Sequence, residues 1–328
     1  MTVDPAYMRR ALELAARGMG NTSPNPMVGA VIVDAAGRII GEGYHRRCGE
    51  GHAEVNAVAS VRDRAALKNA TMYVTLEPCS HYGKTPPCAR LIIDSGSPRV
   101  VVAAGDPFKA VAGRGIAMLR QAGVEVAEGV MAEESRRLNR RFMTAHEHGR
   151  PFITLKWAQS ADGFMDCDRA DGRPARFSTL LTSALVHRLR SLHDAILVGS
   201  ATALADNPRL DCRLWPGRSP RPVVLDRRGR VDASALRMSD PIIFRDYEDL
   251  PDAMRRLYAQ GITSVLVEGG AQVLRSFIDA GLWDAARIEI APARLGERGR
   301  TPAPAIPAGV QKVDIIDGNR IVEVENKF

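Results

Sequence analysis

The sequence predicts an α/β protein built from two domains, and three observations carry this prediction. The chain has 328 residues, more than a single hydrophobic core usually accommodates, and suits two domains of roughly 150 residues each. Strand-like and helix-like segments alternate along the whole chain, which is typical of helices packed on a sheet. The residues Gly-Arg-Pro at 149–151 separate a basic helical segment from a new strand. We therefore expect one domain over residues 1–147 and a second over 148–328.

The first domain should be a sheet with helices on both of its faces. It starts with a helix over residues 5–17, for which Asp4 is a suitable N-cap, Pro5 a suitable first residue and Gly18 a suitable left-handed stop. Alternating apolar residues and turn signals then predict the following elements. These are strands over 27–34 and 38–45, a helix over 52–62, a strand over 71–78, a helix over 87–96, a strand over 99–107, a helix over 113–123, a strand over 124–130 and a basic helix over 131–149.

The second domain repeats the alternation without repeating the sequence, so it should form an independent α/β unit. The expected elements are a strand over 152–160, a helix over 178–192, strands over 194–200 and 221–226, a helix over 252–261, a strand over 263–270, a helix over 271–281 and strands over 285–293 and 312–325.

Composition indicates an ordinary globular protein without a membrane span. Apolar residues make up 45% of the chain and charged residues 25%, no run approaches the ~20 apolar residues of a membrane helix, and the N-terminus lacks the apolar core of a signal peptide. The five cysteines form an odd and sparse set, which argues against a disulfide framework and favours metal ligands or core residues. We expect a cytoplasmic protein.

The net charge of +7 favours anionic ligands, either nucleic acid or phosphorylated small molecules. Basic residues are spread over several segments, and aromatic residues, which would stack on bases, make up only 5% of the chain. We therefore expect a small phosphorylated ligand and no nucleic acid.

Three residues in the first domain have the chemistry of a zinc site. His52 begins a predicted helix, Cys79 follows a strand, and Cys88 begins another helix after two prolines. Zinc prefers imidazole and thiolate ligands, and catalytic zinc sites keep one coordination position open for water. Each residue alone could have a purely structural role, since free cysteines are usually small core residues. The ordered combination of all three indicates one zinc ion per chain.

Glu54 has the position expected of a proton shuttle. It lies two residues after His52, so it points away from His52 on a regular helix, but at a helix start it could reach the open coordination position. In zinc deaminases a glutamate beside the metal-bound water carries protons to the leaving ammonia. We expect Glu54 to be catalytic.

The motifs that contain these residues resemble those of the RibD family of bifunctional riboflavin-biosynthesis deaminase-reductases. They are PNPMVGAVIV, GEGYHRRCGEGHAE and TLEPCSHYGKTPPC, with eight residues between the two cysteines where common cytidine and tRNA deaminases have two. The resemblance implies a cytidine-deaminase-like three-layer α/β/α first domain with His52, Cys79 and Cys88 on zinc and Glu54 as proton shuttle. Asn25, His45 and Lys84 are further candidates for substrate contact, each with a structural alternative.

The second domain has no GxGxxG after its first strand, so a Rossmann dinucleotide fold is not indicated. Its glycine pair Gly269–Gly270 follows a strand and opens a helix, where backbone N–H groups could approach a phosphate, although many such pairs are only turns.

The second half is similar to the reductase domain of the same family, in the segments LKWAQSADG, RLRSLHDAILVGSATALADNPRLDCR and VEGGAQVL. The resemblance implies a dihydrofolate-reductase-like fold that binds NADPH. Lys156 and Asp206 are the polar groups expected near hydride transfer. The cofactor-lining residues it implies are Ala158, Thr202, Asp206, Gly270, Ala271, Gln272, Val273, Leu274, Arg275 and Ser276. The substrate-binding residues it implies are Arg190, Leu210, Arg213 and Glu268, with both arginines suited to phosphate.

One segment departs from the family pattern. Relatives have a serine and a tryptophan in a GES-x-W stretch, whereas this chain has Pro174 and Arg176 at those places. We assign no ligand contact to these residues, because a proline cannot supply a hydroxyl hydrogen bond.

The leading hypothesis is a two-site enzyme. Zinc-dependent hydrolytic deamination of 2,5-diamino-6-(5-phosphoribosylamino)pyrimidin-4(3H)-one would be followed by NADPH-dependent reduction to 5-amino-6-(5-phosphoribitylamino)uracil. One rival is a nucleobase deaminase acting on RNA, with the second half as an RNA-binding module. Another is a scaffold in which His81 completes a structural metal site. The family resemblance also implies a homo-oligomer, a dimer or a tetramer.

Overall fold

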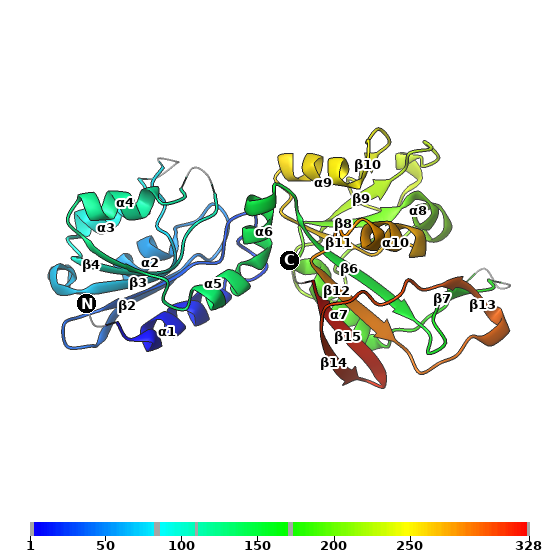
Figure 1. The fold of residues 1–328 in the computed structure, drawn as a ribbon, viewed down its shortest axis with the longest axis horizontal. Helices are drawn as coiled ribbons and strands as arrows, with labels where there is room; N and C mark the ends of the chain where they lie inside the picture. Colours follow the sequence, from blue (N-terminus) through cyan, green and yellow to red (C-terminus); the bar gives the residue numbers. More distant parts are fainter. Residues whose placement is uncertain (1–2, 82–85, 109–110, 170–172, 327–328) are drawn as a thin grey trace. The chain divides into compact units, whose positions relative to one another are not determined.

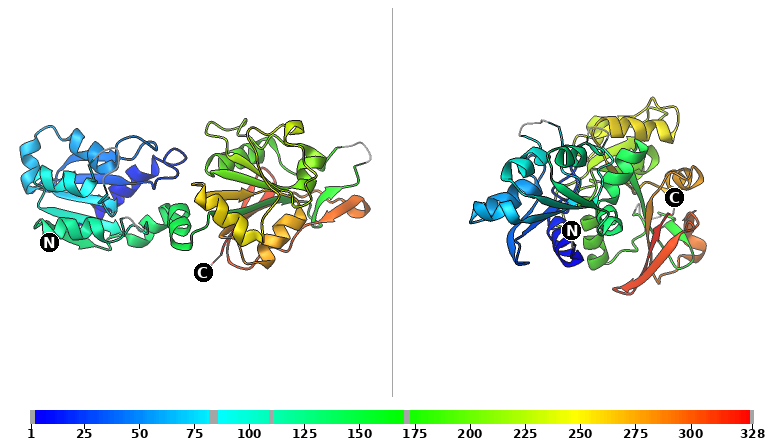
Figure 2. Two further views of the ribbon diagram at one scale, coloured as in Figure 1. Left: turned by 90° about the horizontal axis from the view of Figure 1, so that it is seen from above. Right: turned by 60° about the vertical axis from the view of Figure 1, so that its left-hand side comes forward.

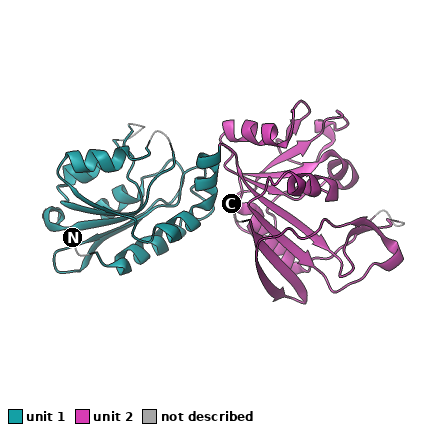
Figure 3. Ribbon diagram, viewed as in Figure 1, with its two compact units in different colours: residues 1–148 teal, residues 149–328 magenta. Residues whose placement is uncertain are grey.

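The protein divides into two compact units, Met1–His148 and Gly149–Phe328 (Figure 3). The structure is a computed structural model and describes residues 3–81, 86–108, 111–169 and 173–326. In this described part of the chain, no helix has the length and apolar character needed to cross a membrane.

The first unit is a five-stranded sheet with helices on both faces (Figure 1). Its strands run in the order β2-β1-β3-β4-β5, with β1 antiparallel to β2 and β3, and with β3, β4 and β5 parallel. Its elements are α1 (Pro5–Ala16), β1 (Gly29–Val33), β2 (Ile39–Tyr44), α2 (Ala53–Ser60), a 3₁₀ turn (Arg64–Asn69), β3 (Thr71–Leu76), α3 (Cys88–Ser95), β4 (Arg99–Ala104), α4 (Arg114–Gln121), β5 (Glu125–Glu128), α5 (Ala132–Leu138) and α6 (Arg140–His148).

Each face of this sheet has its own core because successive strand side chains point to opposite sides. Val31 and Val33 of β1 pack with α1, whereas Ala30 and Ile32 pack with α2, α3 and α4. Figure 2 shows the helices around this sheet from two further directions. The result is the expected three-layer α/β/α domain.

The start of α1 confirms the predicted cap, and its end differs from the prediction. The Asp4 carboxylate accepts the N–H of Ala6, and Pro5 is the first helical residue. Gly18 does not have a positive φ; Gly20 does, with φ 81°.

The predicted basic helix over 131–149 is interrupted at Asn139. This residue is buried, and its side-chain amide exchanges two 2.8 Å hydrogen bonds with the backbone of Met27. Asn139 leaves regular helical geometry, with ψ 19°, and separates α5 from α6. A distant backbone segment therefore overrides the local helical preference.

The second unit contains an eight-stranded sheet and a separate two-stranded sheet. The large sheet has the order β10-β9-β8-β11-β6-β12-β15-β14, in which β15 runs antiparallel to both of its neighbours, β12 and β14, and all other neighbouring pairs are parallel. The elements are β6 (Phe152–Gln159), β7 (Phe164–Cys167), α7 (Leu180–Ser191), β8 (Ala195–Gly199), α8 (Ser200–Asp206), β9 (Arg221–Leu225), a 3₁₀ turn (Ala233–Ala235), β10 (Ile242–Phe244), α9 (Leu250–Ala259), β11 (Ser264–Val267), α10 (Ala271–Asp279), β12 (Ala285–Ile290), a 3₁₀ turn (Gly296–Arg298), β13 (Gly299–Pro302), β14 (Val310–Ile316) and β15 (Asn319–Glu325).

Helices also cover both faces of this sheet. Leu197 of β8 belongs to the core formed with α9 and α10, whereas Ile196 and Val198 belong to the core that includes α8 and Leu189 of α7. Figure 1 shows β7 and β13 as a pair at one side of the unit.

The segment 312–325, expected as a single strand, is part of a hairpin of β14 and β15. The chain reverses at Asp317 and Gly318, with φ 49° and 82°, the left-handed pair of a type I′ turn. The Asp-Gly signal for this turn is present in the sequence. The short elements α8, β7, β10 and β13 were not predicted.

Candidate active sites

Three helix and strand ends bring the expected zinc ligands together in the first unit. His52 is the N-cap of α2, Cys79 follows β3, and Cys88 is the first residue of α3. The Nδ1 atom of His52 and the two sulfur atoms lie within 4.8 Å of one another. The combination of residues predicted from spacing is therefore a real cluster in space.

The geometry of the cluster fits zinc. His52 Nδ1 lies 3.7 Å from Cys79 Sγ and 3.3 Å from Cys88 Sγ. Bond lengths of about 2.0 Å to nitrogen and about 2.3 Å to sulfur place the ligands of a tetrahedral zinc ion roughly 3.5 Å apart. One imidazole and two thiolates are a donor set that zinc favours, and they leave a fourth position for water.

The surroundings of Cys79 favour its thiolate form, which is the form that binds metal. A hydrogen bond from the Cys88 thiol, with others from His52 and the Cys88 backbone N–H, lowers the pKa of Cys79 to about 4. The backbone donor belongs to the first residue of α3, where helix geometry favours negative charge.

Glu54 lies beside this cluster in a buried position. It is the second residue of α2, and only 3% of its surface is exposed. Burial, and then the negative charge of Cys79, raise the pKa of the Glu54 carboxyl. A buried carboxyl group next to an open metal position has the surroundings of a proton-transfer group.

Asn25 and His45 form a hydrogen-bonded pair next to His52. Asn25 Nδ2 lies 3.3 Å from His45 Nε2, and His45 Nδ1 lies 3.2 Å from the Gly51 carbonyl oxygen. The rings of His45 and His52 meet edge to face, with centroids 5.4 Å apart. These contacts place the pair beside the metal cluster.

His81, another residue named from the sequence, does not join the cluster. Among the described residues the candidate metal group contains only the three expected ligands, so His81 is outside it. The His81 ring instead lies 6.4 Å from the ring of Phe108. Lys84 is outside the described residues.

The second unit contains a cavity of about 820 Å³ at the carboxyl ends of its parallel strands. Most residues expected around the cofactor line it, namely Thr202, Asp206, Gly270, Ala271, Gln272, Val273, Arg275 and Ser276. Ala158 is not among the lining residues, and Leu274 is fully buried in the core beneath α10.

The glycine pair lies where the end of β8 and the start of α10 approach each other closely. A Cβ atom on Gly269 would be 2.7 Å from the Gly199 nitrogen, and the Gly270 N–H donates to Thr202 Oγ1 at 2.9 Å. Glycine at position 269 therefore allows β8 and the start of α10 to meet at the cavity.

A buried charged centre adjoins the cavity. Arg190 of α7 donates two hydrogen bonds to the Glu268 carboxylate, at 2.9 and 2.8 Å. Burial raises the pKa of Glu268, but the charge and hydrogen bonds of Arg190, with the Lys156 charge, outweigh it and lower the pKa to about 2. Burial in turn lowers the pKa of Lys156.

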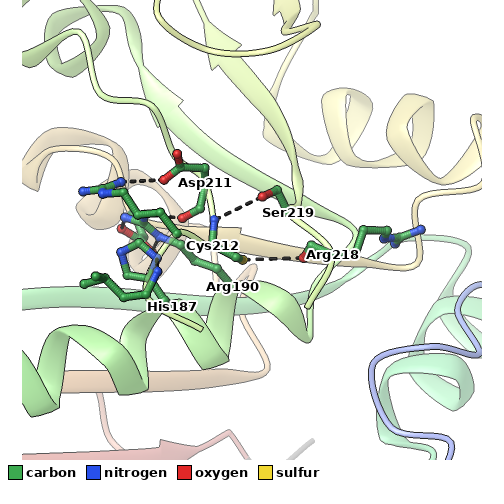
Figure 4. Close-up of polar contacts among 9 residues, drawn as sticks. His187, Arg190, Asp211, Cys212, Arg218 and Ser219 are labelled. Carbon is green, nitrogen blue, oxygen red and sulfur yellow. Dashed lines mark hydrogen bonds and ion pairs between the residues drawn. The ribbon is translucent and has the colours of Figure 1, made fainter. Parts of the chain in front are cut away.

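Leu210 and Arg213 lie in the segment that connects α8 to β9. Leu210 has a left-handed backbone, with φ 56°, and its side chain is buried in the core, so a ligand could reach only its backbone. Arg213 pairs with Asp211 at 2.5 Å and remains half exposed. Figure 4 shows Asp211, the partner of Arg213, close to Arg190.

Several residues of the cavity were not predicted from the sequence. Arg227, Arg228 and Arg230 line it after β9, next to Tyr247. The basic run DRRGR was visible, but nothing local indicated that it faces the same cavity as the glycine pair, which lies 39 to 44 residues further along the chain. Pro174 lines the cavity as well, in the segment that departs from the family pattern.

Comparisons with known proteins match each of the two units to a known domain family. Residues 1–104 match the cytidine and deoxycytidylate deaminase zinc-binding region, and residues 151–315 match the RibD C-terminal domain. The riboflavin biosynthesis protein RibD of Bacillus amyloliquefaciens is 40% identical over 332 residues, which cover 92% of this chain and 87% of that protein. The chain belongs to the RibD family. It is thus a deaminase and reductase of riboflavin biosynthesis, as the motifs implied.

Other RibD proteins and solved structures support the same assignment over nearly the whole chain. RibD of Escherichia coli K12 is 39% identical over 90% of both chains. Acinetobacter baumannii RibD has a TM-score of 0.87 with 33% identity, covering 98% of both chains. A Thermotoga maritima diaminohydroxyphosphoribosylaminopyrimidine deaminase/5-amino-6-(5-phosphoribosylamino)uracil reductase has a TM-score of 0.85 with 36% identity, also covering 98% of both. The RNA-binding and scaffold alternatives therefore lose their support.

Proposed function

We propose that residues 1–147 hydrolytically deaminate 2,5-diamino-6-(5-phosphoribosylamino)pyrimidin-4(3H)-one. The observation that carries this proposal is the buried Glu54 beside the cluster of His52, Cys79 and Cys88. The RibD relatives named above, and the deaminase activity in the Thermotoga maritima protein's description, support the choice of substrate.

The three ligands would hold one zinc ion, which supplies Lewis acidity that activates water at neutral pH. Glu54 would take the proton of the attacking water and return it to the leaving amine. The amino group of the pyrimidine is replaced by oxygen, and ammonia is released. Burial of Glu54 supports this role because water cannot compete for its protons.

The Asn25–His45 pair would orient the pyrimidine. The hydrogen bond from Asn25 Nδ2 to His45 Nε2 leaves Nδ1 as the donor to the Gly51 carbonyl, which makes His45 neutral. Burial lowers the pKa of His45 in agreement. A fixed neutral pair can present polar groups to a substrate without adding charge beside the metal.

We propose that residues 148–328 reduce the deaminated product to 5-amino-6-(5-phosphoribitylamino)uracil with NADPH. The bound cofactor supplies hydride to the opened ribosyl group. The cavity between α8, α10 and β9 is large enough for a dinucleotide, and the helix start at Gly270 favours its phosphates. Thr202, Asp206, Gly270, Ala271, Gln272, Val273, Arg275 and Ser276, which line the cavity, would form the cofactor site.

The arginines after β9 support NADPH over NADH. Arg227, Arg228 and Arg230 line the same cavity as the glycine pair, so one nucleotide could reach both. The extra 2′-phosphate of NADPH would meet these arginines, which suit phosphate oxygens by charge and geometry.

Arg190, Leu210, Arg213 and Glu268 would form the substrate site. Arg190 is already engaged by Glu268 and by the Asp211 carbonyl, so it would shape the site, and the exposed Arg213 would meet the substrate phosphate. The ammonium group of Lys156 makes no hydrogen bond or ion pair with the described residues, and its charge interacts with that of Glu268. Lys156 would therefore be the group that exchanges a proton during reduction.

We also propose a cytoplasmic homo-oligomer, a dimer or a tetramer. The zinc thiolates need a reducing compartment. The edge strand β14 exposes Val313 and Ile315, at 53% and 69% of their surfaces, which supports burial of this strand in an assembly.

The deciding experiment compares wild type with Glu54→Gln, measuring ammonia release and NADPH oxidation. The variant should keep its zinc and its reductase rate but lose deaminase activity by about 10²- to 10⁴-fold, the usual contribution of an acid–base group. Deamination by Glu54→Gln at the wild-type rate would overturn the assignment.

A further inference from the structure

The segment over residues 210–219 contains Arg213, and Figure 4 shows its residues Asp211 and Cys212 close to His187 and Arg190 of α7. Two contacts close this loop on itself: Cys212 N–H donates to Ser219 Oγ at 3.1 Å, and Cys212 Sγ contacts the Arg218 carbonyl oxygen at 3.5 Å. Arg190 donates to the Asp211 carbonyl at 3.0 Å and ties the loop to α7. The loop is therefore a built structure, although it contains no helix or strand.

A second tie to α7 lies on the other side of Arg213. The backbone N–H of Leu214 donates to Nδ1 of His187, at 3.3 Å. His187 lies one helical turn before Arg190, so both residues present side chains to the loop from the same face of α7. Arg213 is thus held between an anchored residue on each side, Asp211 and Leu214.

The Leu214 contact defines the protonation state of His187. A backbone N–H can only donate, so Nδ1 must be unprotonated and the ring must be neutral with its hydrogen on Nε2. Burial, and then the positive charges of Arg190 and Arg213, lower the pKa of His187, against smaller opposing effects of Asp211 and Glu268. Only 4% of the residue is exposed.

We propose that His187 is a positioning residue of the reductase, whose neutral ring holds the Leu214 amide so that Arg213 stays aimed at the phosphate monoester of the ribosyl substrate. This inference rests on the proposed reductase function. The guanidinium of Arg213 is half exposed and could reach a ligand. That of Arg190 is buried and already bonded to the Glu268 carboxylate and the Asp211 carbonyl. A buried histidine that only filled space would not need an acceptor nitrogen at this position.

Two variants of His187 test whether the hydrogen-bond acceptor at Nδ1 matters, or only the size of the side chain. Asparagine places its Oδ1 close to the position of Nδ1 and can still accept the Leu214 N–H, whereas the Oε1 of glutamine reaches the position of Nε2 and cannot. Both are polar and of similar size to histidine. Thermal unfolding followed by tryptophan fluorescence checks the fold, because Trp157, Trp215 and Trp283 all lie in the second unit.

The measurement is calorimetric binding of ribose 5-phosphate, with ribose as the probe without phosphate. His187→Gln should weaken ribose 5-phosphate binding about tenfold, and His187→Asn by no more than about twofold, since one charge-assisted hydrogen bond is affected. In an Arg213→Ala background the His187→Gln change should have no further effect. Ribose binding should be the same in all variants.

The pH dependence gives a second readout. As pH falls, protonation of His187 places a hydrogen on Nδ1 and removes the acceptor, so wild-type affinity should fall more steeply below pH 6.5 than that of His187→Asn. The phosphate titrates near pH 6 in both proteins, and the groups that face His187, namely Arg190, Arg213, Asp211 and Glu268, are unchanged.

The proposal is wrong if His187→Gln binds ribose 5-phosphate like wild type, if its effect persists undiminished without Arg213, or if wild type does not bind ribose 5-phosphate. NADPH oxidation with the pyrimidine substrate is measured separately. Absence of turnover together with the expected binding pattern would contradict the reductase assignment and support the role of His187.

Discussion

A methyl group on Gly115 would lie 1.9 Å from the carbonyl oxygen of Pro78, the residue immediately before Cys79 of the candidate metal cluster. The same segment is held by Glu77, whose carboxylate accepts the N–H groups of Gly113 and Gly115, each at 2.9 Å. The start of α4 therefore packs against residues 77 and 78 and fixes the backbone that leads into Cys79.

Gly115→Ala should displace the Cys79 segment and reduce zinc affinity about 10- to 100-fold, as expected when the support of a metal ligand is disturbed. Zinc content after dialysis, together with ammonia release, measures the effect. Gly123→Ala is the matched control: its φ of 82° makes alanine cost about 1–2 kcal/mol, but nothing lies within 4 Å of the new methyl group. Equal zinc content in the two variants would contradict the prediction.

Removal of the metal should separate the two activities. Chelation, or Cys79→Ser, is expected to lower ammonia release by at least about 100-fold while NADPH oxidation with the deaminated substrate continues. Cys48→Ser is the control, because Cys48 is an exposed free cysteine outside the metal cluster. Loss of zinc from Cys48→Ser, or deamination by chelated enzyme, would argue against the site.

Arg228→Ala should distinguish the two nicotinamide cofactors. Arg227 is engaged with the Tyr247 ring at 4.3 Å and Arg230 with Ser200 Oγ at 2.9 Å, whereas Arg228 makes no hydrogen bond or ion pair within the described residues. We expect the KM for NADPH to rise about tenfold and that for NADH to stay unchanged, because only NADPH has the 2′-phosphate.

Arg237→Ala removes an equal charge outside the cavity and is the control for that experiment. A parallel rise in both KM values for Arg228→Ala would show that the side chain supports the cavity without reading the 2′-phosphate.

Glu268→Gln should change how stability depends on pH. The folded pKa of about 2 lies below the ordinary value of 4.5, so the ionised carboxylate stabilises the fold above about pH 5, and this contribution is lost as pH falls towards 2. This lowering of the pKa from 4.5 to about 2 corresponds to about 3 kcal/mol of unfolding free energy at neutral pH. The gap in unfolding free energy between wild type and Glu268→Gln should therefore narrow from pH 6 to pH 3.

Urea unfolding followed by tryptophan fluorescence measures this gap in the second unit. Glu248→Gln, at an exposed carboxylate, serves as the control and should show little difference from wild type at either pH. A gap for Glu268→Gln that is constant with pH would mean that the carboxylate is not ionised through its pair with Arg190.

The deaminase site could be predicted almost completely from the sequence because its residues lie at the ends of neighbouring elements. His52 precedes α2, Cys79 follows β3 and Cys88 begins α3. Once these helices and strands are predicted correctly, their packing in one α/β domain brings the three residues together. Local signals failed where a distant contact decides the backbone. Asn139 breaks a helix because its amide bonds to Met27, which lies 112 residues away.

The sequence by itself determined the two α/β domains and predicted the cluster of His52, Cys79 and Cys88 with Glu54 near it, because periodicity, capping residues and residue spacing are local properties of the chain. Only the tertiary structure decided which residues share the second site. It placed Arg228 after β9 in one cavity with Gly270 and set the acceptor of His187 against the Leu214 amide. These relationships depend on how parallel strands and crossing helices pack, and short-range sequence patterns carry no information about such distant pairs.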